Sequence, residues 1–225
     1  EHRLRKLVGE KFWIKIQGKI KIIPNGVHND FFKTKATSAS HEKMYSILFV
    51  GELNKNKNII GLIEAVKKAK KSEESIELSV VGNGLLKSDL IKLIKKPEYS
   101  FCKYYGHVND RKSLIDIYNK HSILAIPSLT ETFGLVYIEA LTQGLKVIHS
   151  TGEGVDGYFN NSNIVLSVDP RDVKDIERAL LQLIDKQPTN FIDEKILSLD
   201  RFRWDVIAKQ YASLYECIGI NKEKV

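Results

Sequence analysis

Short apolar runs alternate with longer amphipathic segments through most of the 225-residue chain. The runs at 46–51 and 123–126 are nearly continuous in apolar residues, which is typical of strands buried on both faces, and the run at 77–81 repeats the strand signal. The segments at 59–71 and 173–185 carry apolar residues at helical spacing. This alternation predicts an α/β fold, a Rossmann-like doubly wound parallel sheet with helices on both faces. Further strands are expected at 101–105, 146–149 and 164–168, and further helices at 85–95, 110–119 and 133–143.

Two segments fall outside the alternation and suggest a division into three parts. Residues 1–40 form a lysine-rich lead-in, in which a short strand is expected at Lys21–Ile23. Residues 41–200 form the Rossmann-like domain. Residues 201–225 form a closing helix and tail, rich in aromatic side chains (Trp204, Tyr211 and Tyr215).

Composition and charge limit the classes of function. With 43% hydrophobic and 28% charged residues, the chain has the composition of a globular protein, and no apolar run approaches the roughly 20 residues of a membrane span. Because the chain starts at Glu1 and not at Met, we expect a piece of a longer protein. Cys102 and Cys217 fit neither a metal site nor a disulfide framework, so we expect buried thiols in a reducing compartment.

The net charge of +7 raises the question of nucleic-acid binding. The lysines, however, are spread over the outer faces of the expected helices, and no basic and aromatic residues interleave as in proteins that stack bases. We therefore expect no nucleic-acid partner. Contact with an anionic membrane surface, or a general attraction for anionic substrates, stays as an alternative.

Two acids frame the helix expected to begin near Phe133. Glu139 lies on this mostly apolar helix and has no cation three or four residues away, so its charge is costly unless something hydrogen-bonds it. Three environments are open: water at the helix edge, a distant backbone amide, and a ligand. Before it, Glu131 lies in a polar loop, Thr132 is a candidate N-cap, and Gly134 lets a ligand approach the first free amides. Such a helix start favours phosphate, and the flanking acids suit sugar hydroxyls, so we expect a sugar-nucleotide pocket.

Three glycine-bearing loops follow expected strands: the loop after Gly51, the 82–84 turn, and Gly152-Glu153-Gly154 beyond the strand at 146–149. The 82–84 turn, Gly-Asn-Gly, begins like a dinucleotide-binding motif, but Lys87 stands where a third small residue is needed, so a tight strand-to-helix turn is favoured. After Gly51, the lysines at Lys55 and Lys57 can reach a phosphate as point charges, although a solvated loop explains them equally well. The chain holds no Asp-x-Asp pair, and no metal site is predicted.

Several short motifs match one known family when they are taken as a set. They are Pro24-Asn25-Gly26, Gly51 with Lys57, Gly82-x-Gly84, Gly106-His107-Val108, Pro127-Ser128, and Glu131-x7-Glu139 followed by Gly144. This set resembles the retaining nucleotide-sugar glycosyltransferases of family 4, also called glycosyl transferases group 1. More narrowly, it resembles their C-terminal, donor-binding domain, one half of the two-domain GT-B fold. The resemblance runs from about residue 20 to residue 218.

The resemblance implies two catalytic residues, Glu131 and Lys57. Glu131 would bond the donor sugar's hydroxyls, and Lys57, beside Gly51, would contact the phosphates. Glu139 would bond the ribose. Electrostatic stabilisation of the departing diphosphate would be the main catalytic contribution. The family usually has a basic residue directly after Gly51, where this chain has Glu52. We therefore expect either that Glu52 turns away and Lys55 or Lys57 carries the phosphate alone, or that donor binding is weak.

Backbone groups complete the donor site that the resemblance implies. The amides of Phe133, Gly134 and Leu135 would meet the sugar or the diphosphate, and the backbone near Val108 would hold the base. The substrate would be a nucleotide-sugar such as a UDP- or GDP-sugar, with no cofactor and no metal.

The implied function is transfer of a sugar from a nucleotide-sugar to an acceptor, with retention, in surface polysaccharide or glycolipid synthesis. The family's N-terminal acceptor domain is not in this chain, so we expect the chain alone to be inactive. A cytoplasmic location is expected, with a peripheral position at the inner membrane face as an alternative. Two other functions stay open: a non-catalytic nucleotide-sugar-binding module, and a sugar-nucleotide epimerase-like enzyme on the same fold.

Overall fold

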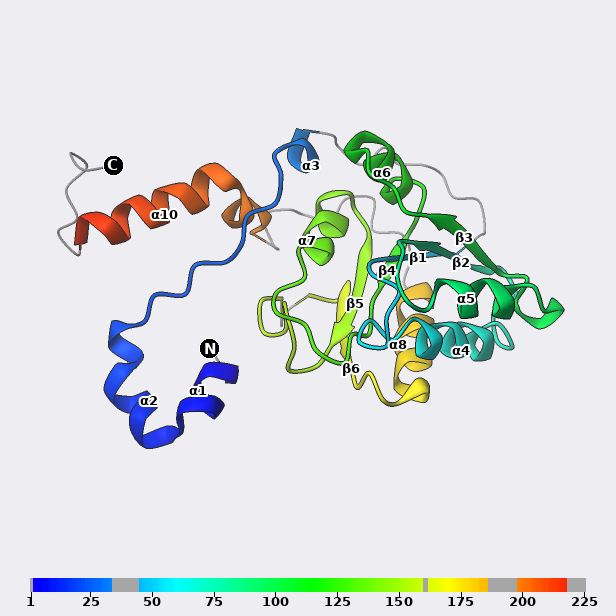
Figure 1. Cartoon of the computed structure of the whole chain (residues 1–225), viewed down its shortest axis with the longest axis horizontal. Helices are drawn as coiled ribbons and strands as arrows, with labels where there is room; N and C mark the ends of the chain where they lie inside the picture. Colours follow the sequence, from blue (N-terminus) through cyan, green and yellow to red (C-terminus); the bar gives the residue numbers. More distant parts are fainter. Residues whose placement is uncertain (1, 34–44, 160–161, 186–197, 218–225) are drawn as a thin grey trace.

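A six-stranded parallel sheet forms the centre of the protein (Figure 1). The computed structural model describes residues 2–33, 45–159, 162–185 and 198–217. The strand order is β3-β2-β1-β4-β5-β6, so the chain winds outward from β1 in one direction and from β4 in the other. This doubly wound order confirms the predicted fold class. The strands are β1 (Tyr45–Val50), β2 (Ile76–Val81), β3 (Cys102–Gly106), β4 (Ile123–Ala125), β5 (Lys146–Ser150) and β6 (Val165–Val168).

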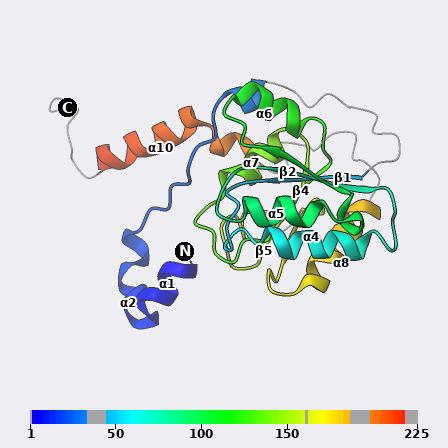
Figure 2. The same cartoon turned by 45° about the vertical axis from the view of Figure 1, so that its right-hand side comes forward.

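Helices cover both faces of the sheet, as Figures 1 and 2 show from two directions. Helices α4, α5 and α8 cover one face, and α6 and α7 cover the other. Within the described ranges, no helix combines the length and the apolar character needed to cross a bilayer. The helices of this domain are α4 (Ile59–Ala69), α5 (Lys87–Ile94), α6 (Arg111–Tyr118), α7 (Leu135–Thr142) and α8 (Val173–Asp185), with a short 3-10 helix η2 (Pro97–Tyr99).

The apolar strand runs become the core because each is covered on both faces. Ile47, Leu48 and Phe49 of β1 are fully buried, and so are Leu124 and Ala125 of β4. Strands β1 and β4 pair directly, although the β2 and β3 units separate them in the sequence. In a doubly wound sheet, ligands bind in the crevice outside the carboxyl ends of two such strands, where the strand order reverses. The loops after β1 and β4 therefore mark the expected ligand position.

The short strand predicted at Lys21–Ile23 does not form. These residues run between η1 (Gln17–Lys19) and α3 (Asp30–Lys33) without a neighbouring strand, and Ile22 is 45% exposed. A segment of three residues does not form a stable strand unless a neighbouring strand pairs with it. A few residues further along this segment, the Val27 amide donates to the Phe202 carbonyl (2.7 Å).

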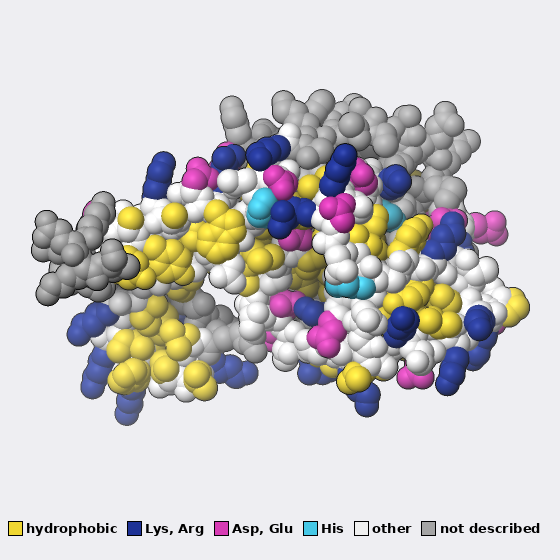
Figure 3. All heavy atoms as spheres, turned by 45° about the horizontal axis from the view of Figure 1, so that its top comes forward, with side chains coloured by type: hydrophobic (Ala, Val, Ile, Leu, Met, Phe, Trp, Pro, Cys, Tyr) yellow, Lys and Arg dark blue, Asp and Glu magenta, His cyan; other side chains and the backbone are white. Residues whose placement is uncertain are grey.

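The closing helix α10 (Trp204–Cys217) presents aromatic side chains to the surface. Trp204, Tyr211 and Tyr215 are each 40–50% exposed, and Ile207 is the buried contact of this helix. The Trp204 ring lies against Gly26, where a Cβ atom would come within 2.6 Å of it. Figure 3 shows apolar side chains along α10 and over α1 (His2–Val8) and α2 (Glu10–Ile16), with Lys and Arg around the latter.

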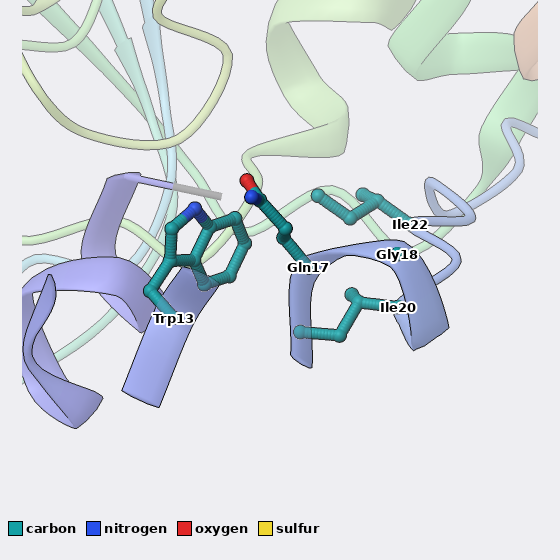
Figure 4. A pocket seen from close by; sticks show the side chains of 5 residues that line it. All are labelled: Trp13, Gln17, Gly18, Ile20 and Ile22. Atoms are coloured by element: carbon teal, nitrogen blue, oxygen red, sulfur yellow. The ribbon is translucent and has the colours of Figure 1, made fainter. Parts of the chain in front are cut away.

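A small pocket lies in the lead-in, at the end of α2 (Figure 4). It is lined by Trp13, Gln17, Gly18, Ile20 and Ile22. No charged side chain lines it, so it offers no counter-charge for a diphosphate. A second hollow, lined in part by His149, Asp156 and Arg178, includes neither Glu131 nor Glu139.

The two cysteines differ from the expectation in one respect. Cys102 is buried in β3, and burial raises its pKa to about 12. Cys217, predicted to be buried, is exposed at the last turn of α10. The prediction for Cys217 was wrong because α10 buries little of its surface against the sheet domain.

Candidate functional site

Two loops meet at the crevice between β1 and β4, and Asn56 joins them. Its side-chain amide donates to the Thr130 carbonyl (2.8 Å). Its side-chain oxygen accepts from the Thr130 amide (3.0 Å) and the Thr130 hydroxyl (2.7 Å). Its carbonyl accepts from the Leu129 amide (2.7 Å). The loop after β1 is thus fixed to the loop after β4.

This junction brings Lys57 and Glu131 together in an ion pair. The Lys57 side chain is 21% exposed and that of Glu131 is 10% exposed, so the pair is largely shielded from water. The Lys57 amide is held by the Asn54 side chain (2.9 Å). The two residues for which the sequence predicted catalytic roles therefore lie in direct contact at the mouth of the crevice.

A third loop, after β5, supports the backbone of Glu131. The Glu131 amide donates to the Glu153 carboxylate (2.7 Å), and the Gly154 amide donates to the Glu131 carbonyl (3.1 Å). Gly154 has a φ of +56°, and a Cβ there would lie 2.8 Å from both the Glu131 side chain and the Phe133 carbonyl. Sequence reasoning gave Glu153 no role. The glycine spacing of this loop was visible in the sequence, but its contact with residue 131 was not.

Helix α7 begins later than predicted, at Leu135, with Gly134 as its N-cap. Gly134 has a left-handed φ of +78°, and a Cβ there would lie 2.3 Å from the Tyr137 ring. Thr132, the predicted N-cap, lies outside the helix and is exposed; its amide donates to Glu131 (3.1 Å). The N-cap prediction was wrong because the left-handed glycine sets the first turn two residues on.

The helix start leaves donors open for a ligand. In the described part of the chain, no group accepts a hydrogen bond from the amides of Phe133, Gly134 and Leu135. These three residues are partly exposed and begin two positions after Glu131. Free amides at a helix start attract anions. The arrangement can therefore hold a negatively charged group beside the Lys57–Glu131 pair.

Glu139 lies one helix turn beyond this start and is bonded to a tyrosine. The Tyr118 hydroxyl, from α6, donates to the Glu139 carboxylate (3.0 Å). Burial raises the pKa of Glu139, while the Tyr118 hydrogen bond and the charge of Arg111 act in the opposite direction. The sequence left a distant backbone amide open as the partner of Glu139, but the structure places the Tyr118 hydroxyl there. Sequence reasoning missed Tyr118, which has no motif around it.

Gly51 and the 82–84 turn form the wall of the crevice on the β1–β2 side. A Cβ on Gly82 would lie 1.8 Å from the Gly51 carbonyl oxygen, and one on Gly84 would lie 2.6 Å from the Leu53 carbonyl. This close packing is the structure of a tight strand-to-helix turn, as predicted. Glu52, next to Gly51, is exposed.

Val108 lies between β3 and α6, beside the same edge of the sheet. Its side chain is partly buried and packs against the core. The backbone of this loop follows Gly106, whose φ is +78°. The loop therefore leaves the carboxyl end of β3 and leads into α6.

The crevice thus combines a shielded Lys–Glu pair, free amides at a helix start, and a second acid held by a tyrosine. Residues 30–195 match the sequence pattern of the family described as Glycosyl transferases group 1. The chain belongs to this family. The sequence prediction of the family is therefore confirmed.

Named members of the glycosyl transferases group 1 family are recognisably similar in sequence. The chain is 26% identical over 174 residues to a glycogen synthase of Mycobacterium tuberculosis, which covers 75% of this chain and 42% of the relative. It is 23% identical over 211 residues to a phosphatidyl-myo-inositol mannosyltransferase of the same species, covering 90% of this chain and 55% of the relative. The chain spans about half the length of these curated relatives.

Solved structures have the same fold. The crystal structure of Anabaena HepE in complex with UDP superposes with a TM-score of 0.72 at 19% identity, covering 88% of this chain and 57% of that one. At this level of identity the likeness shows the fold alone. It agrees with the Rossmann-like half of a GT-B glycosyltransferase that this group 1 sequence predicts.

Proposed function

We propose that this chain is the donor-binding half of a retaining glycosyltransferase that transfers a sugar from a nucleotide-sugar to an acceptor. The observation that carries the proposal is the Lys57–Glu131 ion pair beside the free amides of Phe133, Gly134 and Leu135. A diphosphate needs a cation and amide donors, and a sugar needs a carboxylate that accepts from its hydroxyls. Both sets of groups lie within one crevice.

Each residue has a proposed role in this site. Lys57 and the helix amides stabilise the diphosphate as its bond to the sugar breaks, and Glu131 holds the sugar hydroxyls. Glu139 accepts from the ribose hydroxyls. The backbone near Val108 contacts the base, and Gly51 leaves room for the phosphates. No metal or other cofactor is required in this proposal, because Lys57 and the amides supply the positive potential.

The acceptor site belongs, in this proposal, to a second domain. Supporting this, the chain covers only 42% and 55% of the two relatives described above. The exposed aromatic side chains of α10 offer a surface on which such a domain can pack. The chain alone would then bind the donor and transfer little sugar.

A surface polysaccharide or glycolipid is the proposed product, made at the cytoplasmic side of the membrane. The mannosyltransferase relative acts, by its name, on phosphatidyl-myo-inositol, a lipid. The basic residues around α1 and α2 support contact with an anionic membrane surface (Figure 3).

Calorimetric titration with UDP, GDP and their sugar conjugates tests the donor site. Glu139→Ala should weaken every ribose-containing ligand, whereas Glu131→Ala should reduce the gain in affinity that the sugar adds over the bare nucleotide. Glu77→Ala is the matched control, because Glu77 pairs with Lys103 (2.8 Å) on the β2–β3 pair. Equal binding by the parent and all three variants would end the proposal.

A further inference from the structure

Tyr118 is among the largest fully buried side chains of the described residues, and its hydroxyl contacts Glu139. It lies at the last residue of α6, and its ring makes an edge contact with the Phe31 ring (centroids 6.0 Å apart). Phe31 belongs to α3 in the lead-in and is itself 2% exposed. The Phe31 carbonyl accepts from the side chain of Gln143, which follows α7 (2.7 Å). The phenol is thus fixed by α3 and α7 at once.

The Tyr118 hydroxyl donates its hydrogen bond to the Glu139 carboxylate. Burial and the nearby Glu139 charge raise the pKa of Tyr118 well above its usual value, so the phenol stays protonated and remains a donor. Arg111, seven residues earlier on α6, is the other group that acts on Glu139, by its charge alone. Arg111 also lies 3.4 Å from Asp30 of α3.

One oxygen of the Glu139 carboxylate therefore accepts a hydrogen bond from Tyr118. A carboxylate has two oxygens with about four acceptor positions, so the second oxygen remains for another donor. A hydrogen bond from a rigid, buried phenol fixes the rotamer of the carboxylate and favours its charged form. Both effects matter for an acid that must accept hydroxyl protons from a ligand.

We propose that Tyr118 is a positioning residue of the donor site, which orients Glu139 and keeps it ionised so that it can accept hydrogen bonds from a ribose. This inference rests on the proposed function. The inference adds to the proposed site a residue of α6 that touches no substrate. It gives a role to a buried phenol that takes no part in the sugar transfer itself.

The test is the affinity for UDP as a function of pH, measured by calorimetry on the 225-residue chain between pH 5 and 8.5. Tyr118→Phe removes the hydroxyl and keeps the ring. Losing a hydrogen bond to a charged group should weaken UDP binding about tenfold at pH 6. The midpoint below which affinity declines should move to higher pH, because Glu139 then loses a group that favours ionisation. At pH 8.5 the loss should be smaller.

Tyr99→Phe is the matched control. The Tyr99 hydroxyl donates to the Glu64 carboxylate (2.8 Å), and Tyr99 is 7% exposed, but this pair lies beside α4 and η2, away from the crevice. This variant loses a similar hydrogen bond and should keep the parent's pH profile for UDP. A 2′,3′-dideoxy nucleotide should show no difference between the parent and Tyr118→Phe, because it has no ribose hydroxyls to donate.

The outcomes separate the two proposals. If the parent binds neither UDP nor GDP, the proposed function fails. If the parent binds UDP and Tyr118→Phe has the same affinity and the same pH midpoint, the role of Tyr118 is refuted while the donor site stands. Should Tyr118→Phe not fold, 3-fluorotyrosine placed at position 118 replaces it. Its more acidic phenol is a stronger donor, so the midpoint should move to lower pH, and an unchanged midpoint would refute the role.

Discussion

The Lys57 ammonium and the Glu131 carboxylate, 74 positions apart in the sequence, form an ion pair at the carboxyl ends of β1 and β4. Neither group is open to bulk water to any large extent, because their side chains are 21% and 10% exposed. The cation that is proposed to meet a diphosphate is therefore also the partner of Glu131. A lysine has three donor protons, so it can keep Glu131 and add a phosphate oxygen.

Removing the lysine should cost both stability and affinity. Lys57→Met removes the cation that pairs with the shielded Glu131 carboxylate, so the free energy of unfolding should decrease by about 2 kcal/mol. UDP affinity should decrease as well. Urea denaturation and calorimetry measure the two effects.

Two variants separate charge pairing from simple loss of a side chain. Lys57→Met combined with Glu131→Gln should regain most of the stability and none of the UDP affinity. Lys103→Met, which breaks the more exposed pair with Glu77, should cost less than about 1 kcal/mol. Similar losses for Lys57→Met and Lys103→Met would contradict the shielded ion pair as a source of stability.

Gly82 should tolerate no side chain. A Cβ there would lie 1.8 Å from the Gly51 carbonyl oxygen, which is backbone and cannot move aside without shifting β1. Gly82→Ala should therefore lower the free energy of unfolding by about 3 kcal/mol or more. Gly106→Ala is the control, because Gly106 has a φ of +78° but no atom within 4 Å of the added Cβ. It should cost about 1–2 kcal/mol from the left-handed backbone alone, and equal losses would contradict the close approach as the cause.

Glu52 should weaken donor binding through its charge. It stands beside Gly51 at the mouth of the crevice and is exposed, so its repulsion of a diphosphate is screened by water and salt. Glu52→Lys should raise UDP affinity about threefold at low salt, with the gain declining at 0.5 M salt. Glu98→Lys makes the same charge change on exposed η2 and should leave UDP affinity nearly unchanged. An equal gain in UDP affinity from both variants would show that the net charge of the protein, and not the position of Glu52, controls the affinity.

Glu139 should reduce stability at neutral pH. Burial raises its pKa above the usual value of 4.5, so the unfolded chain releases this proton at a lower pH than the native protein does. Native stability therefore decreases as pH rises from about 4.5 through the pKa of the folded state. Glu139→Gln, which keeps an acceptor for Tyr118, should be more stable than the parent at pH 8 and nearly equal to it at pH 4. Denaturation at the two pH values measures this, and a constant difference would show that ionisation is not the cause.

The fold was predictable because its strands are buried on both faces. The run at 46–51 is almost continuously apolar, and the structure buries its centre in the middle of the sheet. The run at 77–81 contains Glu77 and Ser79, but Leu78, Val80 and Val81 are buried beside them in β2. The prediction of a strand at Lys21–Ile23 was wrong, since a short apolar segment without a neighbouring strand would leave its backbone groups unpaired. Helix ends were displaced by one or two residues, because a left-handed glycine and not a polar side chain sets the start of α7.

The site was predictable only as far as its residues carry a local pattern. Glu131, Glu139 and the glycine turns lie in recognisable spacings, so they could be singled out. Tyr118 and Glu153 could not, because what makes them important is a contact across the fold and not a neighbour in the sequence. The pairing of Lys57 with Glu131 belongs to the same class, since it depends on β1 and β4 lying next to each other.

Asn56 has a consequence for anyone who exchanges parts between members of this family. Four hydrogen bonds tie it to Leu129 and Thr130, so the segments 51–57 and 127–134 fit each other as one piece of backbone. A chimera that imports one segment without the other would leave both with unmatched donors and acceptors. Grafts of donor preference between relatives should therefore carry the two segments together.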